Sequence, residues 1–187
     1  MTPTTRRIAG AAGILLLALV VALLGQRLFK EGSRGPAGTP EVGAEPEGLA
    51  LRTVTVYFGA ADAAGLAAER REVLAHDDLA GDVAATVAEL AAGPIGALRP
   101  VLPAGTHLHH VFADASGNVY LDFGPELASR FEGGLPGEIL ALRALARTLA
   151  ANFGRVGSFV SLIDRKPAAT LGGHLDISRP LAVADWE

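Results

Sequence analysis

The feature that most constrains this chain is an uncharged, apolar run from Ile8 to Leu24, which follows Arg6 and Arg7. A run of about 17 to 19 apolar residues is just long enough to cross a bilayer as an α-helix. The basic, apolar and polar regions follow the order of a signal peptide, but no small-x-small cleavage site precedes Gln26. The sequence therefore predicts a signal anchor over residues 1–28, with about residues 8–24 forming a transmembrane helix in the bilayer.

The same order of regions predicts that the amino terminus stays in the cytoplasm and that the rest of the chain is exported. The chain has no cysteine, so it offers no thiol for lipid attachment, for a disulfide or for a Cys-ligated zinc ion. We therefore expect a single-pass protein of the inner (cytoplasmic) membrane. Its C-terminal domain is expected to face the periplasm or, more generally, the extracytoplasmic side.

Two further regions follow the predicted anchor. Residues 29–50 are rich in Gly, Pro and Glu and cannot bury enough apolar surface to offset their ordering entropy, so they are predicted to be a disordered linker. Residues 51–187 are long enough for one domain with its own core. From Leu51 onward, 11 Lys and Arg stand against 16 Asp and Glu, and this acidic balance argues against nucleic acid as a partner.

The periodicity of the domain predicts an α+β fold. We expect strands at 53–58 and 69–74, a helix that is capped by Asp77 or Asp78 and ends at Gly93, a hairpin over 106–123, a helix at 136–152 and a strand at 156–163. Gly117 is expected to take a positive φ in the turn of the hairpin. The order is β-β-α-β-β-α-β, read as one small mixed sheet with two packed helices. The expected inward-facing residues are Val54, Val56 and Phe58, then Leu79, Val83, Val87 and Leu90, then Val119, Leu121 and Phe123, and finally Ile139, Leu142, Leu145 and Leu149.

Four blocks of the domain stand out: the strand at 53–58, the helix end at 90–94, the turn at 102–106 with the strand at 119–123, and the closing run at 171–178. Together they resemble the GerMN domain family, which is named for sporulation and germination proteins. The resemblance implies an extracytoplasmic location and a fold similar to the ring-building modules of envelope assemblies, and it implies no catalytic centre. This chain departs from the family at the turn of Asp164, Arg165 and Lys166, where a glycine is more usual.

The closing run carries the most distinctive residues of the resemblance, which are Leu171, Gly172, Gly173, His174, Asp176 and Ser178. We interpret them as structural, since two glycines permit a tight reversal that His174 or Asp176 can hydrogen-bond. Two alternatives are a phosphate-cradling loop and a His174/Asp176 catalytic pair. The first lacks a GxGxxG or GxxxxGK[ST] pattern, and the second lacks an evident nucleophile beyond the adjacent Ser178.

Other polar residues could carry chemistry. His107 and His109 would lie on one face of a strand, close enough to share a metal, although no third ligand is evident unless the strand register brings in Asp122. Glycan hydrolysis would need carboxylates that face each other, and the candidate pairs are Asp77 with Asp78 and Glu69 with Glu72. A helix cap and an exposed edge strand explain these pairs without catalysis.

These observations predict a non-catalytic interaction or assembly module of the cell envelope, with no cofactor and no metal. It would bind another envelope protein or itself through an exposed sheet edge or helix face. Arg143 and Arg147, together with Glu69 and Arg70, are the candidate surface. The alternatives are an envelope enzyme, or its accessory subunit, that acts on peptidoglycan, and a module that binds glycan through Tyr57, Tyr120 or Trp186.

Overall fold

A computed structural model of the chain describes residues 50–62 and 65–186. The predicted signal anchor at 1–28 and nearly all of the predicted linker at 29–50 lie outside these residues. Among the helices that the structure describes, none is both long enough and apolar enough to cross a membrane.

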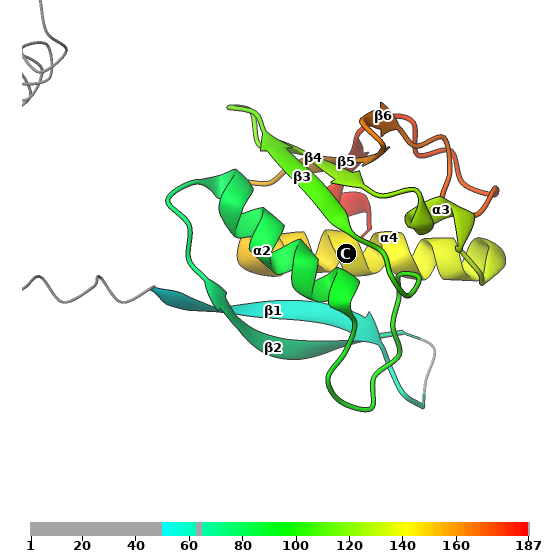
Figure 1. Cartoon of the computed structure of the whole chain (residues 1–187), viewed down its shortest axis with the longest axis horizontal. Coiled ribbons are helices and arrows are strands. Elements are labelled where there is room, and N and C mark those ends of the chain that lie inside the picture. The colour runs from blue at the N-terminus through cyan, green and yellow to red at the C-terminus, as the bar shows by residue number, and fades with distance from the viewer. Residues whose placement is uncertain (1–49, 63–64, 187) are drawn as a thin grey trace, which may run out of the picture. The chain divides into compact units, whose positions relative to one another are not determined.

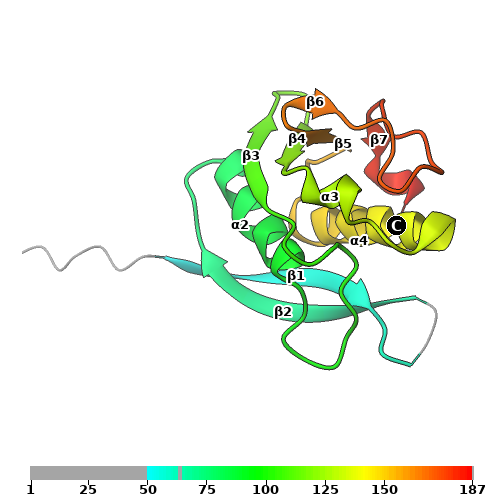
Figure 2. The same cartoon turned by 45° about the vertical axis from the view of Figure 1, so that its right-hand side comes forward.

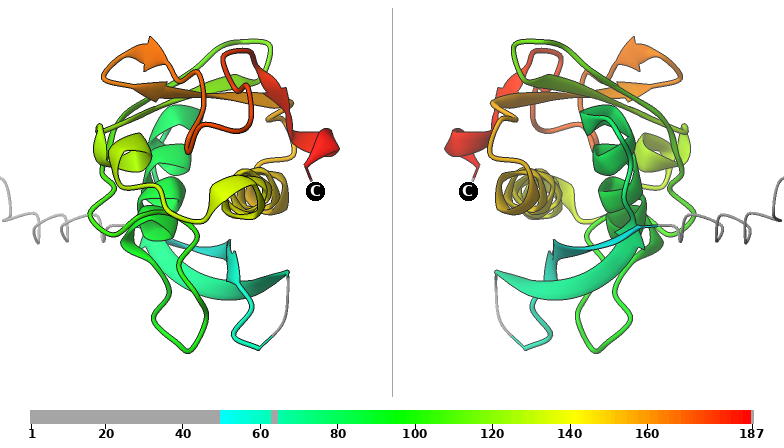
Figure 3. Two further views of the ribbon diagram at one scale, coloured as in Figure 1. Left: turned by 90° about the vertical axis from the view of Figure 1, so that its right-hand side faces the viewer. Right: turned by 90° about the vertical axis from the view of Figure 1, so that its left-hand side faces the viewer.

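The domain has three layers, with two helices between two sheets (Figure 1). The lower sheet is a hairpin of β1 (Leu51–Gly59) and β2 (Leu66–Leu74), and the middle layer holds α2 (Leu79–Ala92) and α4 (Gly134–Asn152). The upper sheet contains β3 (Leu108–Ala113), β4 (Asn118–Phe123), β5 (Ser158–Ile163), β6 (Lys166–Pro167) and β7 (Leu181–Ala182). A short helix α3 (Glu126–Ser129) precedes α4, and a 3-10 turn η1 (Val183–Asp185) follows β7. Seen along α4, the two helices lie side by side between the two sheets (Figure 3).

The predicted α+β class and the order of the main elements are confirmed, whereas the prediction of one small mixed sheet is wrong. The structure has a two-stranded sheet and a separate five-stranded sheet. The sheets cannot join, because α2 and α4 lie between them and need an apolar partner on both sides. The short elements α3, β6, β7 and η1 add to the predicted order, and β6 and β7 both pair with β5 (Figure 2).

Local sequence explains the lower layers. Val54, Val56 and Phe58 alternate along β1 and are at most 1% exposed, as predicted. The α2 helix begins after Asp78, whose Oδ1 accepts a hydrogen bond from the Gly81 N–H at 2.7 Å, so the predicted N-cap is confirmed.

The upper sheet forms around β4, which pairs antiparallel with β3 and parallel with β5. Gly117 has a φ of 85° in the β3-β4 turn, as the sequence predicted, and Val119, Leu121 and Phe123 of β4 are fully buried. The parallel pair β4 and β5 requires a crossover, which α3 and α4 supply.

Candidate functional site

The closing run folds around one buried carboxylate, that of Glu138 in the first half of α4. Its Oε1 accepts hydrogen bonds from the His174 backbone N–H and lies 2.9 Å from His174 Nδ1, while its Oε2 accepts from the Leu175 N–H at 3.0 Å. The Glu138 side chain is fully buried, whereas that of His174 is 47% exposed. The run therefore encloses a charge that an apolar core would otherwise exclude.

The pKa of Glu138 reflects this enclosure. Burial alone would raise it, but hydrogen bonds from the His174 side chain and from the backbone N–H groups of Leu175, His174 and Gly172 lower the pKa of Glu138 below its ordinary value of 4.5. Glu138 is therefore ionised at neutral pH, as an acceptor of several N–H groups must be.

The geometry of the closing run explains why Gly172 and Gly173 are both glycines. A Cβ on Gly172 would lie 2.9 Å from Glu138 Oε1 and 2.9 Å from Phe131 Cδ1, which is closer than van der Waals contact allows. Gly173 has a φ of 97°, which L side chains rarely adopt. Leu171 is buried in the core, so the run is held by an apolar contact at its start and by Glu138 after the glycines.

The other polar residues of the run form a separate local turn. Asp176 Oδ1 accepts from the Ser178 N–H at 3.0 Å and from the Ser178 hydroxyl at 2.7 Å, and these bonds lower the pKa of Asp176. The His174 side chain thus pairs with Glu138, and Asp176 hydrogen-bonds to Ser178, so the structure does not assemble the His174/Asp176 pair that the sequence allowed. In a catalytic triad, a carboxylate orients the histidine by bonding to Nδ1, and a hydroxyl nucleophile bonds to the other ring nitrogen. Within the described residues, however, no hydroxyl bonds to His174.

The histidines at the start of the β3-β4 hairpin are separated by an irregular register. Leu108 pairs with Phe123 and His110 with Asp122, so His109 is the extra residue of a bulge, and His107 precedes the strand. Asp122 therefore faces His110, with 3.6 Å between Oδ2 and Nδ1, and faces neither His107 nor His109. Among the described residues, no three His, Cys, Asp or Glu side chains come together in a group that could hold a metal ion.

Asp122 instead supports the turn of Asp164, Arg165 and Lys166. Its side chain is buried, and its Oδ1 accepts from the Arg165 N–H at 2.7 Å. Asp164 and Arg165 have φ values of 50° and 65°, so two residues with side chains adopt a left-handed conformation that glycine normally takes. The hydrogen bond from the Arg165 N–H to Asp122 holds this left-handed turn against β4.

The two edges of the lower hairpin differ in their backbone partners. On the β1 edge, the Thr55 N–H and C=O bond to the Asn152 side chain at 2.9 and 2.7 Å, and the Tyr57 N–H bonds to Thr148 Oγ1 at 3.1 Å. Gly59 continues this edge by exchanging two backbone hydrogen bonds with Arg99. Side chains of α4 and one bridge therefore close the β1 edge.

The β2 edge lies on the far side of β1 from α4 and has no such cover. Between Ala68 and Glu72, none of its outward backbone groups has a hydrogen-bond partner among the described residues. Ala68, Arg70, Glu72 and Leu74 are exposed along it. We call this uncovered stretch of β2, from Ala68 to Leu74, the open edge.

The core side of β2 carries an ion network. Arg71 is 8% exposed, contacts Glu69 at 2.7 Å and Glu89 at 3.2 Å, and donates to the Gly93 carbonyl at 2.9 Å. Its guanidinium also lies 5.7 Å from the centre of the Phe58 ring. The expectation that the charges of this strand all face solvent is therefore wrong for Arg71, because paired carboxylates let it be buried.

The four residues expected to form one interaction surface occupy different places. Arg143 and Arg147 both lie on α4 and line one small hollow with Leu66, and the Arg147 guanidinium sits 5.3 Å from the centre of the Tyr57 ring. Arg70 is exposed on the open edge. The Glu69 carboxylate forms an ion pair with Arg71 and accepts a hydrogen bond from the Ile95 N–H. It lies on the opposite face of β2 from Arg70.

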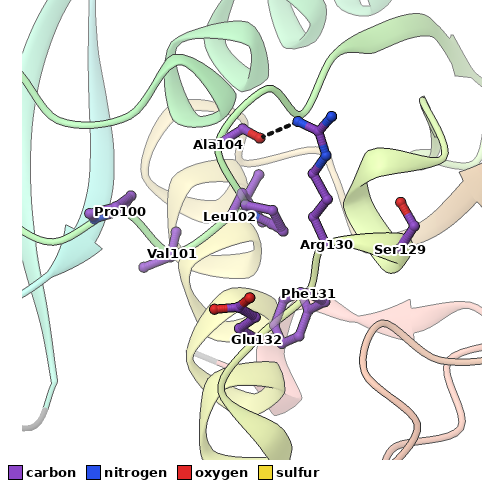
Figure 4. Close-up of a pocket in the computed structure, with 9 residues that line it drawn as sticks. Pro100, Val101, Leu102, Ala104, Ser129, Arg130, Phe131 and Glu132 are labelled. Atoms are coloured by element: carbon purple, nitrogen blue, oxygen red, sulfur yellow. Dashed lines mark hydrogen bonds between the residues drawn. The ribbon is translucent and has the colours of Figure 1, made fainter.

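A cavity of about 550 Å³ lies between the loop after α2 and the segment that joins α3 to α4. Figure 4 shows Arg130 extended toward the Ala104 carbonyl, while Phe131 and Glu132 follow it along the segment that joins α3 to α4. The loop that lines it includes part of the family-like turn at 102–106. The sequence offered no signal for this cavity, because its walls come from two loops.

Sequence reasoning missed Glu138 and took Ile139 as the inward residue, whereas Ile139 is 37% exposed. A usable signal was present, since Glu138, Leu142, Leu145 and Leu149 are spaced by four, three and four residues and share one helix face. A charged residue on that stripe indicates a buried partner that periodicity alone does not identify.

Solved structures share this fold. A chain named "Putative Lipoprotein from Clostridium perfringens" is 22% identical with a TM-score of 0.53, and the match covers 76% of this chain and 95% of that one. The tandem GerMN domains of the sporulation protein GerM from Bacillus subtilis are 18% identical with a TM-score of 0.54, over 76% of this chain and 49% of that one. The first GerMN domain of the same protein is 18% identical with a TM-score of 0.53, over 70% and 97%.

The search of curated proteins gave no match. Residues 55–169 match the Germane family, which is described as sporulation and spore germination. Because that match spans more than half of the sequence, and because the fold is that of solved GerMN domains, this chain belongs to the Germane family.

Proposed function

We propose that this protein is a non-catalytic interaction module of the bacterial cell envelope, which binds a protein partner through the open edge of β2. The observation that carries the proposal is the contrast between the two hairpin edges. Asn152, Thr148 and Arg99 close the β1 edge, whereas the outward backbone groups of β2 from Ala68 to Glu72 have no hydrogen-bond partner in the part of the chain that the structure describes. A strand with free N–H and C=O groups is a template for another strand.

The predicted anchor gives this edge its context. A helix over residues 8–24 would hold the domain at the outer surface of the cytoplasmic membrane, with residues 29–50 as a tether. Such confinement raises the effective concentration of the edge near partners that are held at the same membrane surface. A weak pairing between short strands can then be substantially populated. The family's link to sporulation and germination supports an envelope role of this kind.

Photocrosslinking in intact cells tests the proposal. A photoreactive amino acid replaces Arg70 on the open edge, and a matched variant carries it at Lys166 of β6, which is exposed in the upper sheet. We expect specific protein adducts from position 70, identified by mass spectrometry, that position 166 does not give. Equal adduct patterns at the two positions would refute an interaction through this edge.

The contact between Glu138 and His174 favours one alternative, an envelope enzyme or an accessory subunit that acts on peptidoglycan. The carboxylate holds His174 Nδ1 at 2.9 Å and leaves the other ring nitrogen available as a base. Incubation of the full chain with purified peptidoglycan, followed by chromatography of released fragments, decides between the two. Turnover that His174→Ala abolishes would replace the interaction module with this alternative, whereas retention of glycan without turnover would indicate a glycan-binding module.

A further inference from the structure

The direction of the free backbone groups on β2 follows from its pairing with β1. The Ala75 N–H donates to the Ala50 carbonyl at 2.8 Å, and Ala75 continues the register in which Leu51 faces Leu74. In an antiparallel pair, hydrogen-bonded and non-hydrogen-bonded positions alternate. The odd-numbered residues of β2 therefore bond to β1, and Ala68, Arg70, Glu72 and Leu74 direct their N–H and C=O groups away from it.

The side chains of these residues share one face, because they alternate with the odd-numbered residues along the strand. Arg70 and Glu72 are both exposed, and neither has an ion-pair partner within the described residues. By contrast, Glu69 and Arg71 satisfy each other on the core face. The open edge thus presents one cation and one anion two residues apart, beside free backbone groups.

From this arrangement we infer that the partner of the open edge is a second copy of this chain. The inference rests on the proposed function and assigns its partner. Two β2 strands would pair antiparallel about a twofold axis through Arg71, so that Arg70 of each copy lies opposite Glu72 of the other. The symmetry makes two such cross-strand ion pairs, and the two hairpins become one four-stranded sheet.

The charge pattern selects this register among those that the backbone allows. Hydrogen bonding requires an even-numbered residue to face an even-numbered one, so neighbouring registers differ by two residues. One neighbouring register places Arg70 opposite Arg70, and the other places Glu72 opposite Glu72, so each brings like charges together on the axis. The register that joins Arg70 to Glu72 also places Ala68 opposite Leu74, and it leaves the Leu66 end of the strand outside the ladder.

On the core face of the paired sheet, the residue at the twofold axis is Arg71, and its surroundings allow two copies of it to come together. The two copies of Arg71 would meet there, but each is already neutralised by Glu69 and Glu89 and bonded to the Gly93 carbonyl. These contacts hold the guanidinium over Phe58, within its own protomer. The pairing therefore adds no uncompensated charge.

Charge exchange at the two exposed positions tests the pairing. Arg70→Glu gives a copy with two acidic residues on the edge, and Glu72→Arg gives one with two basic residues, so each variant repels itself. Each single variant replaces two attractive ion pairs with two repulsive ones. The dissociation constant of the self-paired dimer should therefore rise about 30-fold, which is on the order of 2 kcal/mol. The double variant R70E/E72R restores both pairs between two identical copies, and a mixture of the two single variants restores them between two different chains.

The absence of cysteine from the sequence gives a direct readout of register. The full chain carrying both Ala68→Cys and Leu74→Cys, in its own membranes under mild oxidation, should form a disulfide-linked dimer, since opposed residues lie within disulfide reach. The two positions are too far apart along one strand to link within a chain. Ala68→Cys alone is the control and should give no dimer. Each charge variant is then made in the double-cysteine chain.

The outcomes separate this inference from the proposed function. Loss of the dimer in R70E and in E72R, with recovery in the double variant and in the mixture, supports the self-pairing. A dimer that is insensitive to these charges, or an equal yield from Ala68→Cys alone, would overturn it. If position 70 photocrosslinks to a different protein while no disulfide dimer forms, the interaction function stands and the self-pairing falls.

Discussion

Replacing Glu138 with Gln tests whether the buried carboxylate holds the closing run in place. The change keeps the size and shape of the side chain but replaces one acceptor oxygen with an NH₂ donor. If the remaining oxygen keeps the bonds to His174, the new NH₂ faces the Leu175 N–H, which Glu138 Oε2 now accepts at 3.0 Å. One unsatisfied buried donor costs about 1–3 kcal/mol, and the loss of charge weakens the remaining bonds, so we expect about 2–4 kcal/mol of destabilisation.

The assay is urea unfolding of the full chain in detergent micelles, followed by the fluorescence of Trp186. This is the only tryptophan of the sequence, and it packs against the core. Glu132→Gln is the matched control, because it makes the same chemical change on an exposed residue of the loop before α4. A Glu138→Gln protein within about 0.5 kcal/mol of the wild type at pH 7.5, where an isolated surface change would fall, would refute the structural role.

The pH dependence of the same measurement has a definite sign. The pKa of Glu138 is lowered in the folded state, so its stabilising effect is complete above the ordinary value of 4.5 and is lost as pH falls through the lower folded value. The stability difference between wild type and Glu138→Gln should therefore narrow below pH 4.5. A gap that stays constant between pH 5 and 3 would contradict the lowered pKa.

Three further substitutions probe the scaffold by the same unfolding assay. Gly172→Ala should destabilise by about 1–3 kcal/mol, because its Cβ would lie 2.9 Å from the Glu138 carboxylate, while Gly154→Ala, which meets nothing within 4 Å, should stay near wild type. Asn152→Ala removes both bonds to the Thr55 backbone and should cost about 1–3 kcal/mol while exposing the β1 edge; unchanged stability would show that the edge is closed by other means. Asp78→Ala should cost about 1 kcal/mol through loss of the α2 cap, and no change in the unfolding midpoint would argue against that cap.

The parts of the fold that follow from local pattern were predictable. Alternation in β1 identified its inward residues, the cap and glycine signals bounded α2, and the turn before β4 was placed on Gly117. The existence of two sheets was not predictable in the same way. Strand pairing partners are set by which faces α2 and α4 leave apolar, and that depends on contacts between residues far apart in the sequence.

The buried charges show why the candidate site was only partly predictable. Along β2, charged residues occupy both faces, so alternation could not reveal that Arg71 is buried and Arg70 exposed. The burial of Arg71 depends on Glu89, which follows 18 residues later. Glu138 likewise depends on His174, 36 residues away. The sequence identified the closing run as distinctive, but the side chain that explains its glycines lies in another element.

The sealing of β1 by Asn152 and Thr148 limits how far the hairpin can grow. A strand with both edges free could add copies on either side and extend into a fibre, which is the common hazard of exposed sheets. Here the side chains of α4 take the place of a neighbouring strand on the β1 side, so the described hairpin has one edge at which a strand can add. Strand addition at this hairpin must therefore end after one step, and growth beyond two copies would need a different contact.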